Sequence, residues 1–169
     1  NVLESIRMAS EVFHNLKSIL KDQSLSTAVG DEGGFSPDLK NTREALNLIV
    51  LAIKRANYVP GKDIYIGLDV AGTQLFKENN YFVDGNSYHR DLFINFLLDL
   101  VENYPIVSIE DPVDENDWHG FRLITKRLGD KIQLVGDDLF VTNIECLQKG
   151  IDNQAGNAIL LKLNQIGTY

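Results

Sequence analysis

The chain has 169 residues, 44% of them hydrophobic, a single cysteine and a formal net charge of −8. These values fit one domain with a substantial core, exclude an internal disulfide, and argue against nucleic acid or an anionic membrane as a partner. No apolar run approaches the roughly 18 residues of a membrane span. The opening residues are polar and periodic, unlike a signal peptide, and the missing initiator Met indicates a fragment or a processed chain.

Three segments have the apolar spacing of amphipathic helices. The first covers residues 3–22, the second follows a cap at Asn41 or Thr42, and the third lies near residues 89–103. Shorter helices are predicted around residues 118–128 and 144–149. Each of the last three follows a run of strand length, so helices and strands alternate along most of the chain.

Four apolar runs have the length of strands: IYIGLDV, PIVSIED, IQLVGDD and AILLKLN, at residues 64–70, 105–111, 132–138 and 158–164. They are apolar on successive residues, which is typical of parallel strands buried on both faces. Residues 26–29, STAV, are a further possible strand. The alternation with helices predicts an α/β fold with a parallel sheet.

Each of these runs ends in a charged residue: Asp69, Glu110, Asp137 and Lys162. Because parallel strands point the same way, their ends meet at one edge, where α/β folds build their sites. A charge at one strand end is ordinarily a solvated terminus. Four in succession favour a shared site.

Three carboxylates at one edge repel one another unless a cation lies between them. Oxygen ligands suit a hard ion such as Mg²⁺ or Mn²⁺, and the absence of His and Cys from the set disfavours zinc. The chain's histidines have no ligand spacing and are not expected to act in catalysis: His14, His89 and His119.

Two further residues each allow a structural and a chemical interpretation. Lys162 interrupts an apolar strand, either as the partner of a carboxylate or as a base whose neutral form is favoured near a metal. Glu32 lies in GDEGG, which is either an acidic turn or a loop that brings a proton donor to the shared edge. The GK[ST] ending of a phosphate-binding P-loop is absent.

Five stretches, in order, resemble the enolase family: VGDEGGFSP, IGLDVA, YPIVSIEDP, GDKIQLVGDDLFVTN and LLKLNQIGT. The fourth is closest to bacterial-type sequences. The resemblance implies a partial TIM-type (β/α) barrel that does not close within this chain. It also implies Mg²⁺-dependent, reversible dehydration of 2-phosphoglycerate to phosphoenolpyruvate in glycolysis. The full-length protein is expected to be a cytoplasmic homodimer, with a pool at the cell surface also expected from the resemblance.

The resemblance also assigns roles residue by residue. Glu32 matches the proton donor and Lys162 the base that removes the C2 proton, while Asp69, Glu110 and Asp137 match the Mg²⁺ ligands. Glu110, Asp137 and Lys162 would also face the substrate. The neighbouring acids, Asp111 and Asp138, are candidates for a supporting role, because successive strand residues point to opposite faces.

The sequence departs from the family pattern in one region. Gln74 stands where a Glu is expected, Leu75 is inserted, and residues 75–90 are a few residues short in a segment that the family keeps mobile. Residues 1–169 match a single segment of the catalytic barrel domain, without the N-terminal α+β domain and the end of the barrel. The chain alone is therefore expected to be inactive.

Two other functions stay open. One is a related enzyme that acts on a different hydroxy acid. The other is a truncated, non-catalytic protein of enolase origin with a binding or vestigial role, which the Gln74 departure and the incomplete length favour.

Overall fold

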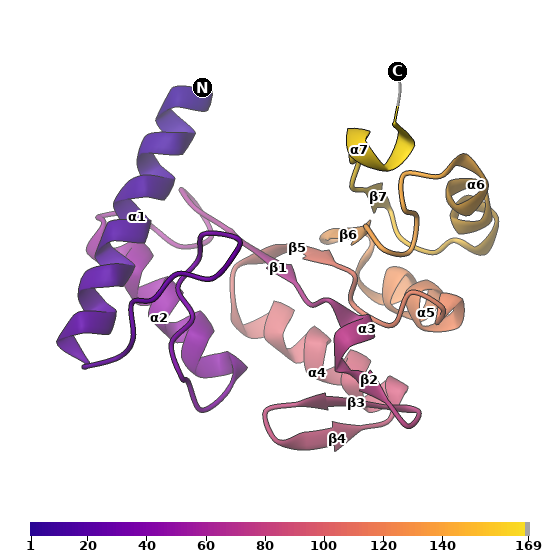
Figure 1. The fold of residues 1–169 in the computed structure, drawn as a ribbon, viewed down its shortest axis with the longest axis horizontal. Helices are drawn as coiled ribbons and strands as arrows, with labels where there is room; N and C mark the ends of the chain where they lie inside the picture. Colours follow the sequence, from indigo (N-terminus) through magenta and orange to yellow (C-terminus); the bar gives the residue numbers. More distant parts are fainter. Residues whose placement is uncertain (168–169) are drawn as a thin grey trace. The chain divides into compact units, whose positions relative to one another are not determined.

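The computed structural model describes residues 1–167, which form two compact units, residues 1–64 and residues 65 onward (Figure 1). The first unit is helical apart from its loops. Every strand found among the described residues lies in the second unit. None of the described helices combines the length and the apolar character that crossing a membrane would require.

The first unit is built on two helices, α1 (Val2–Asp22) and α2 (Thr42–Arg55), as predicted. Asn41 caps α2, because its side chain accepts a hydrogen bond from the backbone N–H of Glu44 at 2.9 Å. The two helices pack through buried and partly buried apolar side chains, namely Val12, Leu16, Ile19, Leu20, Leu25, Phe35, Leu39, Leu48 and Ala52. The apolar residues whose spacing predicted the two helices therefore contribute to this core.

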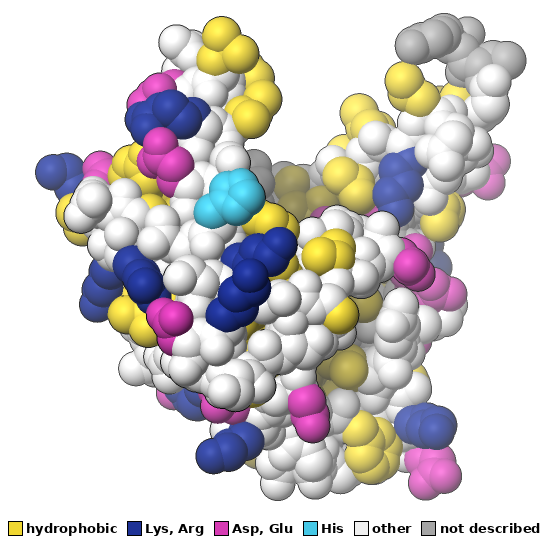
Figure 2. Space-filling model, turned by 60° about the vertical axis from the view of Figure 1, so that its left-hand side comes forward, with side chains coloured by type: hydrophobic (Ala, Val, Ile, Leu, Met, Phe, Trp, Pro, Cys, Tyr) yellow, Lys and Arg dark blue, Asp and Glu magenta, His cyan; other side chains and the backbone are white. Residues whose placement is uncertain are grey.

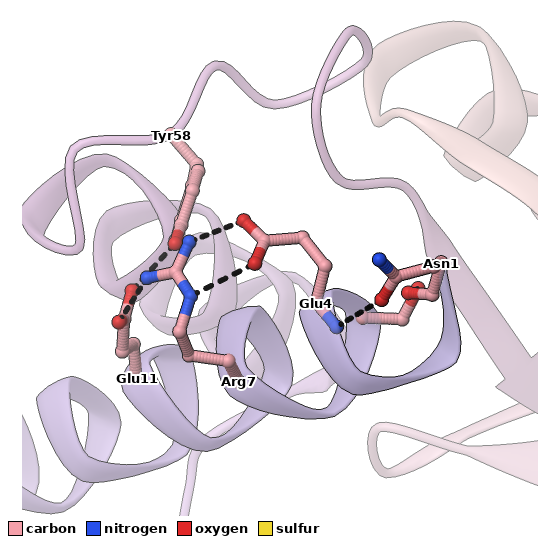
Figure 3. A network of polar contacts seen from close by, with 6 residues as sticks. Asn1, Glu4, Arg7, Glu11 and Tyr58 are labelled. Carbon is pink, nitrogen blue, oxygen red and sulfur yellow. Dashed lines mark hydrogen bonds and ion pairs between the residues drawn. The ribbon is translucent and has the colours of Figure 1, made fainter.

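The N-terminal half of α1 extends beyond this core. Val2, Leu3 and Ile6 are 74%, 80% and 62% exposed, and hydrophobic side chains reach the surface at this end of the helix (Figure 2). Further along, Arg7 pairs with Glu4 and Glu11 on the same helix, and the Tyr58 hydroxyl donates to Glu11 (Figure 3). These ion pairs are half exposed, so they stabilise the helix only weakly.

The loop at residues 27–37 is a tight reversal. The N–H of Gly33 donates to the carbonyl of Gly30 at 3.0 Å, and Gly33 has a φ of +84°, which glycine adopts at little cost. The strand predicted at residues 26–29 is wrong: only Val29 forms a bridge, to Phe35. The N–H of Ser36 also donates to the carbonyl of Ala28, but no strand forms at residues 26–29.

The second unit contains a four-stranded parallel sheet in the order β1-β5-β6-β7. Three helices alternate with the strands, as the sequence predicted (Figure 1). The strands are β1 (Ile66–Asp69), β5 (Ile106–Glu110), β6 (Gln133–Gly136) and β7 (Ala158–Ile159), and the helices are α4 (Arg90–Asn103), α5 (Trp118–Leu128) and α6 (Ile144–Asn153). The α/β class and the partial barrel are confirmed, and within the described residues the barrel does not close.

The last predicted strand is much shorter than expected. Residues 158–164 form β7 only at Ala158 and Ile159, and the short helix α7 (Leu163–Ile166) begins after Lys162. The N–H of Leu160 still donates to β6, at the carbonyl of Gly136, but that of Lys162 donates to the Thr142 hydroxyl. Lys162 thus lies beyond the strand.

A small antiparallel sheet was not predicted. After the short helix α3 (Gly72–Leu75) come β2 (Phe76–Lys77), β3 (Asn80–Val83) and β4 (Asn86–Tyr88). The two-residue turns between them, 78–79 and 84–85, have positive φ at both positions. This is the type I′ geometry, for which Asp84-Gly85 is a strong signal.

The core of the second unit is formed by the sheet and by helices α4 and α5. Its fully buried apolar side chains include residues of β5, β6, α4 and α5: Phe93, Ile94, Ile109, Phe121, Ile124 and Leu134. This packing holds the strands, and therefore their carboxyl ends, in fixed register.

Tyr81 joins the antiparallel sheet to this core. Its ring is fully buried and stacks on Phe93, with centroids 4.4 Å apart, and its oxygen accepts the backbone N–H of Asp114 at 3.0 Å. Burial is the main cause of the raised pKa of its hydroxyl. The phenol therefore stays protonated.

Tyr81→Phe is expected to lower the free energy of unfolding by about 1–3 kcal/mol, because the buried N–H of Asp114 loses its acceptor. Urea denaturation of the chain measures this loss. Tyr65→Phe is the matched control, since Tyr65 is 50% exposed. Equal stability of the two variants would contradict the prediction.

Candidate metal and acid–base site

Three acidic side chains stand where neighbouring parallel strands end. Asp69 and Glu110 are the last residues of β1 and β5 and are direct partners in the register. Asp137 immediately follows Gly136, the last residue of β6. The sheet therefore places all three at one edge, as the sequence predicted.

The charges at this edge act on one another. The pKa of Glu110 is raised, first by burial and then by the negative charges of Asp69, Asp137 and Asp111, while Lys162 opposes the shift. Asp69 is the largest of the charge contributions. The cluster thus disfavours full ionisation, and a bound cation would relieve that repulsion.

Asp137 is the acid of this cluster that has a carboxylate oxygen without a hydrogen-bond partner among the described residues. Its side chain is buried, and Oδ2 forms an ion pair with Nζ of Lys162. Its other oxygen, Oδ1, is buried and accepts no hydrogen bond from the described residues. A buried carboxylate oxygen without a partner is costly, so this atom fits a metal ligand.

Lys162 reaches the edge from the segment after β7. Its pKa is raised, mainly by the hydrogen bond to Asp137, and burial opposes the shift only in part. Of the two interpretations that the sequence left open, the structure shows the lysine paired with a carboxylate, whereas the base interpretation, which favours the neutral form near a metal, stays a prediction.

Asp111 lies beside this cluster, and its carboxylate accepts hydrogen bonds from backbone N–H groups. Its side chain is buried, and its two oxygens accept the N–H groups of Asp137 and Asp138 at 3.0 and 2.9 Å. Asp111 itself has a φ of +39°. Its carboxylate therefore fixes the start of the loop after β6, a role that the sequence left open.

Within the described residues, Glu110, Asp111 and Asp137 offer carboxylate oxygens that lie within 4.8 Å of one another. The sequence predicted Asp69 in place of Asp111. The Asp111 oxygens accept two backbone N–H groups, whereas Asp69 accepts one, from Ala71, and the role of Asp69 as a ligand stays a prediction. None of the histidines belongs to this group.

Thr142 was not singled out from the sequence. Its hydroxyl accepts the backbone N–H of Lys162 at 2.9 Å and donates to Oε1 of Gln165 at 2.6 Å. The contact joins residues that are 20 positions apart. No local spacing rule could have found it.

Glu32 lies in the first unit, whereas the carboxylate cluster lies in the second. It is exposed at the tip of the Gly30–Gly33 turn. The turn accounts for Gly33, whose φ is positive. The approach of Glu32 to the cluster stays a prediction.

Fold and site together define an α/β-barrel type of domain with an acidic, cation-compatible cluster at the carboxyl ends of its strands. The family described as "Enolase, C-terminal TIM barrel domain" matches residues 1–169, and the chain belongs to this family. Membership is consistent with the use of a divalent metal and a small-molecule substrate.

Proposed function

We propose that this chain is the central barrel segment of a bacterial-type enolase, a hydro-lyase that converts 2-phosphoglycerate to phosphoenolpyruvate. The observation that carries the proposal is the meeting of Asp69, Glu110 and Asp137 at adjacent strand ends, with Lys162 paired to Asp137. We further propose a cytoplasmic homodimer in glycolysis, formed by a longer polypeptide that supplies an N-terminal domain and the rest of the barrel.

The proposed metal ligands are Asp69, Glu110 and Asp137, and the proposed ion is Mg²⁺. The buried, unpartnered Oδ1 of Asp137 and the all-oxygen donor set support this choice. When bound, the ion would supply positive charge to the substrate carboxylate, whose negative charge grows as the C2 proton leaves.

The proposed acid–base pair is Lys162 and Glu32. Nζ of Lys162 takes the proton from C2, the C2 electron pair forms the C2–C3 double bond, and the C3 hydroxyl leaves as water with a proton from Glu32. Lys162 must be neutral to accept a proton. Because pairing with Asp137 raises the pKa of Lys162, the mechanism requires that Asp137 be engaged elsewhere in the active state.

The test is phosphoenolpyruvate formation by the complete natural polypeptide that contains these residues. Conversion of 2-phosphoglycerate in Mg²⁺, its loss on chelation and its recovery on re-addition are the expected results. The 169-residue chain assayed alone should be inactive, since its four parallel strands leave the barrel open.

The same assay decides between the alternatives. If the complete polypeptide ignores 2-phosphoglycerate but dehydrates another hydroxy acid, the chain belongs to a related enzyme. If it dehydrates none, the protein is non-catalytic. The non-catalytic alternative is supported by the open barrel and by the departure from the family pattern around Gln74.

A further inference from the structure

The turn after β6 has an unusual backbone. Val141 and Thr142 have φ values of +42° and +53°, so two successive β-branched residues adopt the left-handed conformation. This conformation is a genuine outlier for such residues and persists only where the surroundings enforce it. Observed strain of this kind is a reason to look for a function.

The strained turn links the proposed metal ligand to the proposed base. It starts at Asp137, whose backbone carbonyl accepts the N–H of Val141 at 2.7 Å. It ends at Thr142, whose hydroxyl accepts the N–H of Lys162. The same hydroxyl donates to Gln165 in α7, so it both accepts and donates a hydrogen bond.

The side chains of Lys162 and Asp137 also contact each other directly. Lys162 and Asp137 form an ion pair through Nζ and Oδ2, while Thr142 holds the Lys162 backbone. Lys162 otherwise lies between a two-residue strand and a four-residue helix. The hydroxyl therefore holds the backbone from which the Lys162 side chain reaches Asp137.

We propose that Thr142 is a positioning residue, whose hydroxyl sets the place of Lys162 at the strand-end site through its backbone N–H. The proposal rests on the proposed function of Lys162 as the base. Proton abstraction is sensitive to placement, and a shift of about 1 Å can cost on the order of 100-fold in rate.

The experiment compares three variants of the complete polypeptide. Thr142→Val removes the hydroxyl and keeps the β-branched shape, Thr142→Ser keeps the hydroxyl, and Thr125→Val is the matched control. The Thr125 hydroxyl also makes one donated and one accepted hydrogen bond, to Phe121 and from Gly156. The readouts are exchange of the C2 proton of 2-phosphoglycerate with deuterated solvent, the melting temperature and Mn²⁺ affinity.

Thr142→Val is expected to slow exchange by about 10- to 100-fold, with Mn²⁺ affinity retained. Thr142→Ser should recover most of the rate, and Thr125→Val should lower the melting temperature without slowing exchange. If Thr142→Val does not fold, Thr142→Ala removes the same hydroxyl without the added methyl group.

The inference is overturned if Thr142→Val exchanges the proton as fast as the parent protein, or if Thr142→Ser is as slow as Thr142→Val. A slow Thr125→Val variant would also overturn it, since general destabilisation would then explain the loss. If the parent protein itself shows no exchange, the proposed function fails before the role of Thr142 is in question.

Discussion

Replacing Lys162 with alanine in the complete polypeptide is expected to abolish exchange of the C2 proton of 2-phosphoglycerate. Loss of a general base typically costs about 10²- to 10⁴-fold. Proton NMR in deuterated solvent follows the exchange directly. Because the exchange requires only removal and return of the C2 proton, it isolates the step assigned to Lys162.

Two comparisons make this prediction specific. Glu32→Gln should keep the exchange but block dehydration, because Glu32 is assigned to the leaving hydroxyl. Lys149→Ala removes a lysine that lies over the ring of Trp118, at 4.1 Å from its centroid, and should leave exchange intact. Full dehydration by Glu32→Gln would show that the assignment of the glycine-flanked loop is wrong.

The second large effect is expected from Asp137→Asn. The substitution keeps the size of the side chain but removes the charge of a buried carboxylate with one unpartnered oxygen. We expect Mg²⁺ or Mn²⁺ affinity, measured by calorimetric titration, to fall by more than the roughly 10- to 100-fold that loss of an outer partner of a metal site costs.

Asp138→Asn is the matched control for this experiment. It makes the same change at the next residue, whose side chain is exposed. Its backbone N–H, which donates to Asp111, is unaltered. If the two variants weakened binding equally, the cation would be responding to the general negative charge of this edge and not to a ligand at Asp137.

The sequence predicted the parallel sheet because burial of the strands leaves a direct trace. β1, β5 and β6 lie within largely apolar runs, and each is followed or ended by an acid that the structure places at the same edge. The expected burial on both faces is not found within the described residues, because each strand keeps at least one exposed position, such as Val107 in β5. The helix predicted around residues 118–128 is confirmed as α5. In these elements, local pattern and tertiary environment agree.

The failures have different physical causes. The run at 158–164 is as apolar as a strand, but Lys162 leaves the sheet because its N–H bonds to Thr142. The antiparallel strands are short and half polar, so the sequence signal for them is limited to the Asp84-Gly85 turn. The hydrogen bond between Lys162 and Thr142 joins distant residues and has no local signal, whereas the hairpins are local structures.

The same limit applies to the site. Its three acids could be predicted from strand ends, whereas the supporting contacts of Asp111 and Thr142 join residues 20 or more positions apart. The pairing that raises the pKa of Lys162 is also a tertiary contact. Spacing rules describe single helices and strands. They can therefore predict the acids at strand ends, but not the hydrogen bonds between elements that position those acids and Lys162.

The most direct test of the account is the position of a bound cation. Crystals of the complete polypeptide grown with Mn²⁺ would show the ion by its anomalous scattering. The account predicts an ion coordinated by Asp69, Glu110 and Asp137, with Asp111 still bonded to the backbone of the β6 loop. An ion held by Asp111 with Asp69 turned away, or no ion at this edge of the sheet, would contradict it.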